Sequence, residues 1–202
     1  GSMDRAGRFK HIDGEGNTQQ TQLLQPGEIY QRRTKPSAQD MIVPLVKKLV
    51  EAGEKVIVFR NQRGTAEGCA GYLADELGLE TDSVTLQKLP RNSSSTSQRL
   101  KTCLQGGTAF HNSNLTREER TAIERSFRDS NSKLRVLAAT TTLAAGLNTP
   151  ASTVILAEHE FLGEDGRSFS VAEYKNMAGR AGRVGFNEQG KSIILADDGY
   201  TI

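Results

Sequence analysis

The stretch Val56-Ile57-Val58-Phe59, with the residues that follow it as far as Gly78, decides the fold of this chain. Four consecutive apolar residues, most of them β-branched, are typical of a strand that is buried on both faces of a sheet. In Gly64–Leu77 the spacing of the apolar residues becomes helical, and Gly78 follows as the kind of residue that ends a helix. The stretch therefore predicts a buried strand that leads through a short loop into an amphipathic helix.

The same alternation of strand and helix continues toward the end of the chain. Further strands are predicted at 108–110, 134–139, 153–156 and 192–196, and further helices at 96–104, at 116–127 and from 171 onward. Thr116 with Glu119, and Ser170 with Glu173, have the spacing of capping boxes at helix starts. Repeated strand–helix units predict an α/β fold, with a mostly parallel sheet and helices on both faces. Ligand crevices of such sheets lie at the carboxyl ends of the strands, here after residues 59, 110, 139 and 156.

The chain divides at about residue 36. Residues 1–35 are polar and predict a tag scar, a linker and an edge strand or two, outside the core; Gly1-Ser2-Met3 resembles the remnant of a cleaved tag. Ser37 with Asp40 predicts a capped helix start, and Pro44 either kinks that helix or marks its true start. We expect residues 36–202 to form one domain.

The composition is that of a globular protein. The chain has 202 residues, of which 25% are charged and 36% hydrophobic, and its net charge of +2 gives no global attraction for nucleic acid. No apolar run approaches the about 18 residues that a membrane span needs, so no membrane partner is expected. Cys69 and Cys103 show neither a disulfide framework nor a metal-ligand pattern. They predict reduced, buried thiols in a cytoplasmic, intracellular protein without a metal site.

One sequence pattern is misleading. The letters of Gly185–Ser192 match a phosphate loop, GxxxxGK[ST]. A working phosphate loop follows a strand and opens a helix, so that helix N–H groups converge on the phosphates. Here the apolar run at 193–196 predicts that Lys191 leads into a strand, so we interpret the pattern as a turn before a strand. The glycines at 179, 182 and 185 are likewise no dinucleotide fingerprint, because they lie at a helix end with the wrong spacing.

Three segments carry candidate chemistry. Phe59–Gly64 and Ala139–Asn148 each follow a predicted strand, and Asn176–Arg183 lies at a predicted helix end. Each places hydrogen-bond donors or small residues where we expect the edge of the crevice. Arg180 and Arg183 are three apart, hence neighbours on one helical turn, and adjacent glycines let the backbone approach a ligand. Arginines near a helix end can also simply complement the helix dipole.

In this order the segments resemble the motifs of superfamily 2 helicases. Asn176–Arg183 resembles motif VI, Ala139–Ala151 resembles motif V, Phe59–Gly64 resembles motif IV, and Phe110–Leu115 with Arg120 resembles motif IVa. The resemblance covers about residues 56–195. It points to the second RecA-like domain of DExH helicases, in the group of archaeal repair helicases and exosome-associated RNA helicases. It implies a RecA-like fold and a part in ATP-dependent unwinding.

The resemblance implies two groups of site residues. The first group would face ATP across a cleft between domains. Arg180 and Arg183 would contact the γ-phosphate, and the residues beside the nucleotide would be Gly146, Asn148, Asn176 and Gly179. Contacting a single nucleic-acid strand would be Arg60, Gln62, Arg63, His111, Thr140 and Thr141. By residue type alone, the threonines can be ordinary strand residues, His111 a structural histidine, and the polar residues at 60–63 scaffolding or a solvated loop.

The chain departs from the family pattern at three positions. Asn176 stands where motif VI usually has glutamine or histidine, and Asn112 and Asn114 stand where motif IVa often has a second histidine and a glycine. Between motifs V and VI some relatives carry a strand-separating hairpin. Phe161–Phe169 occupies that place, although it is short for a long wedge.

Two parts of an ATP site are missing from the sequence. It holds no acidic DExH-type box and no working phosphate loop, which are the parts that hold the triphosphate and magnesium. The resemblance implies that a preceding RecA-like domain supplies them and binds most of the ATP and Mg²⁺. We expect this chain to be half of a motor that binds single-stranded DNA or RNA but has no significant ATPase activity alone. The alternative is a non-catalytic RecA-like module that binds nucleic acid or protein, against which the paired arginines weigh.

Overall fold

The computed structural model describes residues 1–141, 149–158, 169–182 and 190–196. The strands are β1 (Ser2–Met3), β2 (Arg8–Ile12), β3 (Thr18–Gln22), β4 (Val56–Arg60), β5 (Thr108–His111), β6 (Val136–Thr140), β7 (Thr153–Leu156) and β8 (Lys191–Leu195). The helices are α1 (Gln39–Glu51), α2 (Arg63–Leu77), α3 (Ser83–Lys88), α4 (Ser95–Gln105), α5 (Arg117–Arg128) and α6 (Val171–Ala178). Every strand and helix that the sequence predicts is present, and the additional elements are α3 and a third strand within residues 1–35.

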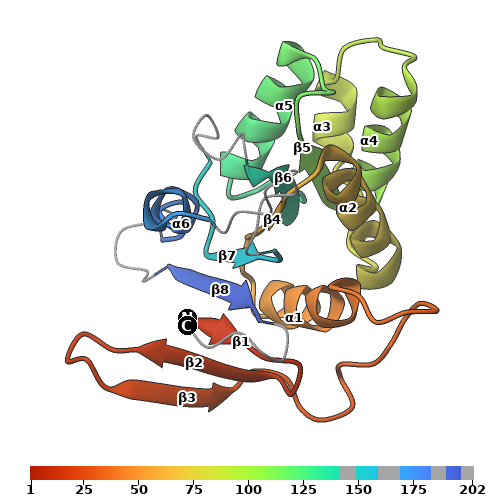
Figure 1. Cartoon of the computed structure of the whole chain (residues 1–202). Helices are drawn as coiled ribbons and strands as arrows, with labels where there is room; N and C mark the ends of the chain where they lie inside the picture. Colours follow the sequence, from red (N-terminus) through yellow and green to blue (C-terminus); the bar gives the residue numbers. More distant parts are fainter. Residues whose placement is uncertain (142–148, 159–168, 183–189, 197–202) are drawn as a thin grey trace.

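The strands form one sheet in the order β3-β2-β1-β8-β7-β4-β6-β5 (Figure 1). From β1 to β5 along this order all neighbours are parallel, whereas β2 and β3 are added antiparallel. Every residue of β4, β5, β6 and β7 is buried, which explains their continuous apolar sequences. The predicted α/β class, with a mostly parallel sheet of RecA-like type, is confirmed.

Helices cover both faces of the parallel strands (Figure 1). Helices α1 and α2 lie against one face, α6 lies on the other, and α3, α4 and α5 gather around the end of the sheet formed by β5. A helix that connects two parallel strands runs back antiparallel to them. The first turns of α2 and α5 therefore lie at the carboxyl ends of β4 and β5, where the fold class predicts a ligand site.

Side chains fix the starts of α5 and α6 as the sequence predicts. The Thr116 hydroxyl accepts a hydrogen bond from the Glu119 N–H at 3.2 Å, and the Glu119 carboxylate accepts one from the Thr116 N–H at 2.8 Å. Ser170 and Glu173 form the same reciprocal pair before α6. Helix α2 ends at Gly78, whose φ of 61° is the left-handed conformation that favours glycine.

Helix α1 runs through Pro44, so the alternative that this proline marks the start of the helix is wrong. A proline inside a helix leaves the carbonyl four residues earlier without its usual N–H donor. That carbonyl belongs to Asp40, and it accepts a hydrogen bond from the Arg32 guanidinium at 3.2 Å instead. Ser37 does not cap the helix either, because only the reverse bond forms, from the Ser37 N–H to the Asp40 carboxylate at 2.9 Å.

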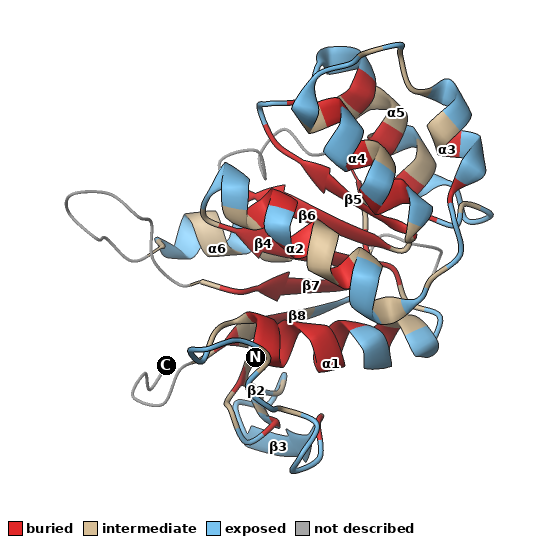
Figure 2. Cartoon of the chain, turned by 90° about the vertical axis from the view of Figure 1, so that its right-hand side faces the viewer, coloured by how far each residue is buried: buried red, intermediate tan, exposed pale blue. Residues whose placement is uncertain are grey.

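Residues 1–35 contribute more to the core than the sequence predicts. Strand β1 extends the parallel sheet beside β8, and Met3 and Leu24 are fully buried. By contrast, the β2–β3 hairpin projects from the body of the domain, and every residue of β3 is exposed (Figure 2). The expected edge strand is thus present, but the expectation that this segment lies outside the core is wrong at Met3 and Leu24.

Lys55 joins the start of β4 to the end of α5. Its ammonium group donates to the carbonyl oxygens of Phe127 at 2.7 Å and Asp129 at 2.5 Å, and the residue is only 4% exposed. These carbonyls belong to the last turn of a helix, which lacks donors of its own. Burial, together with the charge of Arg135, lowers the pKa of Lys55 to about 8, although Asp129 and Asp82 act in the opposite direction.

The free energy of unfolding is therefore expected to rise between about pH 8 and pH 10. In the unfolded chain a lysine keeps its proton up to about pH 10.4, whereas in the folded chain Lys55 releases it near pH 8. The unfolded state then binds more protons in this window, so stability increases with pH. Urea denaturation at about pH 7.5 and 9.5 measures the effect. The free energy of unfolding of the non-titrating variant Lys55→Met should fall relative to that of the original chain as the pH rises. If the difference in unfolding free energy between the two proteins is the same at both pH values, the pKa of Lys55 is not lowered.

Within the described ranges, no helix is both long and apolar enough to cross a membrane. In the same part of the chain, no three histidine, cysteine or acidic side chains come together as metal ligands. Cys69 and Cys103 are buried and unpaired, as predicted, and burial raises the pKa of Cys103 to about 12.

Candidate functional site

The carboxyl ends of β4, β6 and β5 meet at one edge of the sheet, which we call the carboxyl edge. There the register pairs Arg60 with Thr140 and His111 with Ala139. Neighbouring strands are about 4.8 Å apart, so these three strand ends span about 10 Å. Residues that are predicted to contact a nucleic-acid strand, and that come from three separate segments, therefore lie together at this edge, as the fold class requires.

Arg60 is held inside the carboxyl edge by Glu158. Its Nε and Nη2 atoms lie 2.7 and 2.6 Å from Glu158 Oε1, and Asn61 donates its N–H to Glu158 Oε2 at 3.2 Å. Arg60 also donates to the Tyr72 hydroxyl at 3.3 Å and is only 9% exposed. These contacts favour the scaffolding alternative for Arg60. Sequence reasoning missed Glu158, although it lies just after the strand at 153–156, in a segment already expected to border the crevice.

His111 and Thr140 are buried at the same edge. His111 lies with Nε2 2.8 Å from Glu124 Oε1. Burial lowers the pKa of His111, only partly offset by Glu124, so the ring is neutral at pH 7 and donates its Nε2 proton to the carboxylate. Thr140 is 3% exposed at the end of β6, whereas Thr141 is half-buried. The Thr141 hydroxyl is buried and has no hydrogen-bond partner among the described residues.

Gln62 and Arg63 are the exposed members of the carboxyl edge. Gln62 is the N-cap and Arg63 the first residue of α2, and the Gln62 side chain makes no capping hydrogen bond. The first N–H groups of a helix and the positive end of its dipole attract anions. Arg63 also donates from Nη1 to Asn114 Oδ1 at 3.0 Å, which brings the segments resembling motifs IV and IVa into contact. An exposed guanidinium beside a helix start suits the phosphates of a nucleic-acid strand.

The segment resembling motif VI lies at the opposite ends of the strands, which we call the amino edge. Ala151, just before β7, donates to the Arg180 carbonyl at 2.9 Å and accepts from the Gly182 N–H at 2.8 Å. Our expectation that all three segments share one crevice edge is wrong for this one. The reason is that the chain leaves β6 at the carboxyl edge but must return to the amino edge to begin β7. The motif VI segment pairs with Ala151 at that starting point of β7. At about 3.3 Å per residue, Ala151 is about 17 Å from the far end of β7.

The predicted nucleotide-facing residues are only partly described. Asn176 is exposed on α6, Gly179 is the exposed C-cap of that helix, and Arg180 is half-buried. Several residues lie outside the described part of the chain: Gly146, Asn148, Arg183, Thr142, and residues 161–168, which occupy the place where some relatives carry a strand-separating hairpin.

Gly190 and Lys191, the end of the false phosphate loop, have structural roles at the amino edge. A Cβ atom on Gly190 would lie 2.1 Å from Gly182 N and 2.2 Å from Ala181 C, so only glycine permits this backbone contact. Lys191 is the first residue of β8, and its ammonium pairs with the Glu54 carboxylate. The interpretation of this pattern as a turn before a strand is confirmed at Lys191.

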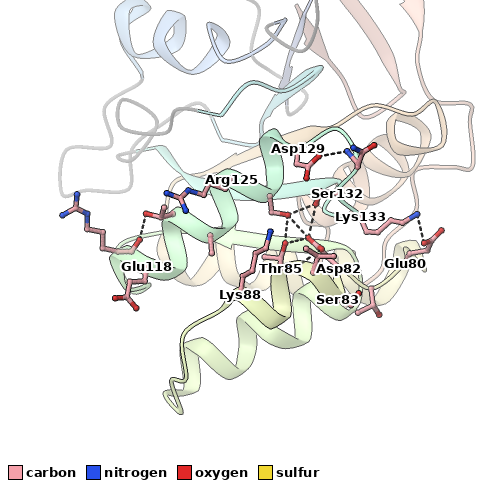
Figure 3. A pocket seen from close by; sticks show the side chains of 17 residues that line it. Glu80, Asp82, Ser83, Thr85, Lys88, Glu118, Arg125, Asp129, Ser132 and Lys133 are labelled. Atoms are coloured by element: carbon pink, nitrogen blue, oxygen red, sulfur yellow. Dashed lines mark hydrogen bonds and ion pairs between the residues drawn. The ribbon is translucent and has the colours of Figure 1, made fainter.

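A groove of about 990 Å³ lies between α3, α5 and the loop at 129–133 (Figure 3). At its base the buried Asp82 carboxylate accepts hydrogen bonds from the hydroxyls of Thr85, Ser126 and Ser132 at 2.6, 2.8 and 3.1 Å. The Asp82 carboxylate and these three hydroxyls thus serve as hydrogen-bond partners for one another. None of the predicted site residues that the structure describes lines the groove, so it is separate from the described parts of both edges.

Residues 39–185 match the protein family described as helicase conserved C-terminal domain. The chain is 35% identical over 167 residues to the ATP-dependent DNA helicase Hel308 of Methanocella arvoryzae, which covers 78% of this chain and 22% of the relative. It is 37% identical over 153 residues to Hel308 of Thermoplasma volcanium, and 37% identical over 158 residues to that of Pyrococcus abyssi. Each of these two alignments covers 75% of the chain and 22% of the relative. The chain thus spans about a fifth of the length of these curated relatives.

Proposed function

This chain belongs to the helicase conserved C-terminal domain family, and from that premise we propose that it is the second motor domain of an ATP-dependent nucleic-acid helicase. Residues 36–202 would form this domain, and the preceding residues would link it to another RecA-like domain. The relatives are named ATP-dependent DNA helicases, so single-stranded DNA is the strand we expect, with RNA as the alternative. ATP and a nucleic-acid strand as ligands would place such a motor inside the cell.

The observation that carries the proposal is the pairing of Ala151 with the turn at 180–182. Two backbone hydrogen bonds and a parallel bridge join the end of the segment resembling motif V to the segment resembling motif VI. The two described ends of the motif V segment therefore lie at opposite edges, with Thr140 at the carboxyl edge and Ala151 at the amino edge. A single segment that reaches both edges is what a motor needs to relate nucleotide binding to strand binding.

At the amino edge the chain would supply positive charge to ATP. Arg180 and Arg183 would approach the γ-phosphate, where an arginine stabilises the charge that develops as the phosphoryl group transfers. Gly146, Asn148, Asn176 and Gly179 would border the nucleotide. Guanidinium and backbone N–H donors suit an anion and not a cation, so Mg²⁺ would be held by the preceding RecA-like domain. When bound there, Mg²⁺ neutralises part of the phosphate charge.

At the carboxyl edge the chain would hold the strand by its backbone. Gln62 and Arg63 offer exposed donors that suit phosphate oxygens, and the buried Thr141 hydroxyl, which has no hydrogen-bond partner among the described residues, would be a further donor at this edge. Arg60, His111 and Thr140 are buried and would support this surface from beneath rather than bind the strand directly. Contacts to phosphates carry no sequence information, as befits an enzyme that moves along any strand.

ATP turnover by the purified chain tests the division of labour between domains. We expect no significant hydrolysis by the folded chain, with or without single-stranded DNA or RNA, because the phosphate-loop domain is needed to hold the triphosphate. The variant Lys191→Ala serves as the control. Appreciable hydrolysis that this substitution abolishes would overturn the proposal and make the chain an independent NTPase. Circular dichroism must show that both proteins are folded.

A further inference from the structure

Glu67 is a buried carboxylate with an unusual set of partners beneath the carboxyl edge. It lies in α2, one helical turn after Arg63, and is only 4% exposed. Its Oε1 atom accepts hydrogen bonds from the side-chain amides of Asn112 and Asn114, both at 2.9 Å, and its Oε2 atom accepts one from Arg99 at 2.6 Å. Burial alone would raise the pKa of Glu67, but these three donors lower it, so the carboxylate is charged at neutral pH.

Asn114 connects this carboxylate to Arg63. The amide nitrogen of Asn114 donates to Glu67, and its amide oxygen accepts from Arg63 Nη1 at 3.0 Å. The backbone of the loop is fixed as well, since the Asn114 N–H donates to Asn112 Oδ1 at 3.0 Å. Because Glu67 can only accept hydrogen bonds when ionised, it determines which end of the Asn114 amide faces Arg63.

From this geometry we propose that Glu67 is a positioning residue, which acts through Asn114 to orient the Arg63 guanidinium for a phosphate of the bound strand. The inference rests on the proposed function, because it assigns Arg63 a strand phosphate as its ligand. It also explains the two asparagines that depart from the motif IVa pattern: both are donors to one oxygen of Glu67.

The benefit to binding is a smaller loss of side-chain freedom. An exposed arginine that is free to rotate must be immobilised when it binds, which weakens an interaction by about two- to tenfold for each such side chain. Arg63 is exposed, yet one of its nitrogens is already held by Asn114. A glutamine at this position has one acceptor oxygen where Glu67 has two, so it cannot accept from Arg99 and from the two asparagines at once. The Asn114 amide then loses its fixed partner, and Arg63 loses its preferred orientation.

Strand binding by four forms of the full chain tests the inference: the original, Glu67→Gln, Arg63→Ala and the double variant. The probe is a fluorescently labelled single-stranded oligodeoxynucleotide, followed by anisotropy over a range of salt concentrations. We expect Glu67→Gln to weaken binding about two- to tenfold. Arg63→Ala should weaken binding and reduce the salt slope by about 0.7, the value for one phosphate contact on a single strand. The double variant should bind like Arg63→Ala alone.

Two further variants distinguish the orientation of Arg63 from two other effects of Glu67→Gln, namely a loss of folding stability and the loss of a negative charge. Asn114→Ala interrupts the connection at an exposed residue and leaves the carboxylate with Arg99, so it should reproduce the Glu67→Gln effect even if that variant folds poorly. Glu124→Gln removes a negative charge at the same edge, where its partner is His111 and not Arg63, so it should not weaken binding.

Each outcome decides the matter. If Glu67→Gln weakens binding equally in the presence and absence of Arg63, Glu67 does not act through that arginine and the inference is wrong. If Arg63→Ala leaves both affinity and salt slope unchanged, the positioning role fails while the proposed function stands. If the original chain binds no oligonucleotide even at low salt, the strand-binding part of the proposed function fails, and the role of Glu67 with it.

Discussion

Replacing Arg183 by alanine, in a protein that joins this domain to its phosphate-loop domain, is expected to lower ATP turnover by a factor on the order of 10³–10⁵. The reason is that an arginine at the γ-phosphate acts mainly in the transition state, where charge spreads over the transferring group. Binding of a single strand should be nearly unchanged, because the turn at 180–182 lies at the amino edge and the residues proposed to contact the strand lie at the carboxyl edge. Arg180→Ala is expected to behave in the same way.

The measurements are the steady-state rate at saturating ATP and the affinity for a labelled single strand. Arg8→Ala is a suitable control, since Arg8 lies in the projecting hairpin and pairs with Asp4. Full turnover by Arg183→Ala would show that this residue is no arginine finger. Together with intact strand binding, that result would favour the alternative of a non-catalytic RecA-like module.

Replacing Gly190 by alanine is expected to lower the free energy of unfolding by about 1–3 kcal/mol, the usual cost of overpacking. The added Cβ would lie 2.1 Å from Gly182 N and 2.2 Å from Ala181 C. Both neighbours are backbone atoms, so they cannot move aside as a flexible side chain would. For a chain of this length each kcal/mol lowers the midpoint of thermal unfolding by about 2–4 °C. In the proposed two-domain motor, the displaced turn should also reduce ATP turnover.

Gly71→Ala provides the matched control. Gly71 lies within α2, where a Cβ meets no atom within 4 Å, and glycine inside a helix is less favourable than alanine by roughly 0.5–1 kcal/mol. The two substitutions add the same methyl group, yet Gly71→Ala should stabilise the chain and Gly190→Ala should destabilise it. Equal stability of the two variants in thermal and urea unfolding would refute the close backbone contact at Gly190.

Local sequence signals predict the elements of this fold well because each depends on residues within a few positions. The capping boxes at Thr116 and Ser170 and the left-handed glycine at Gly78 are of this kind. Helix α3 escaped prediction since it is only six residues long, and its start depends on Asp82, whose carboxylate also binds hydroxyls more than forty residues away. A helix that short leaves no clear period in the sequence.

The candidate site is predictable by residue but not by arrangement. The resemblance to helicase motifs selects residues near the strand ends, yet the partners of these residues are distant in sequence. Arg60 pairs with a carboxylate 98 residues away, and Glu67 with amides 45 and 47 residues away. Such pairs follow from strand order, which no local pattern contains. For the same reason, the sequence did not reveal that the motif VI segment lies at the opposite edge from the other two.

The two edges are connected by strands whose stiffness has a mechanical consequence. Strands β4 and β6 are buried along their whole length and hydrogen-bonded to neighbours on both sides. Close-packed interiors deform little. A displacement imposed at the amino edge would therefore appear at the carboxyl edge as a rotation of the whole domain, not as a local distortion. With a lever about 17 Å long, a rotation of roughly 10° moves the far end by about 3 Å, close to the rise per residue of an extended strand.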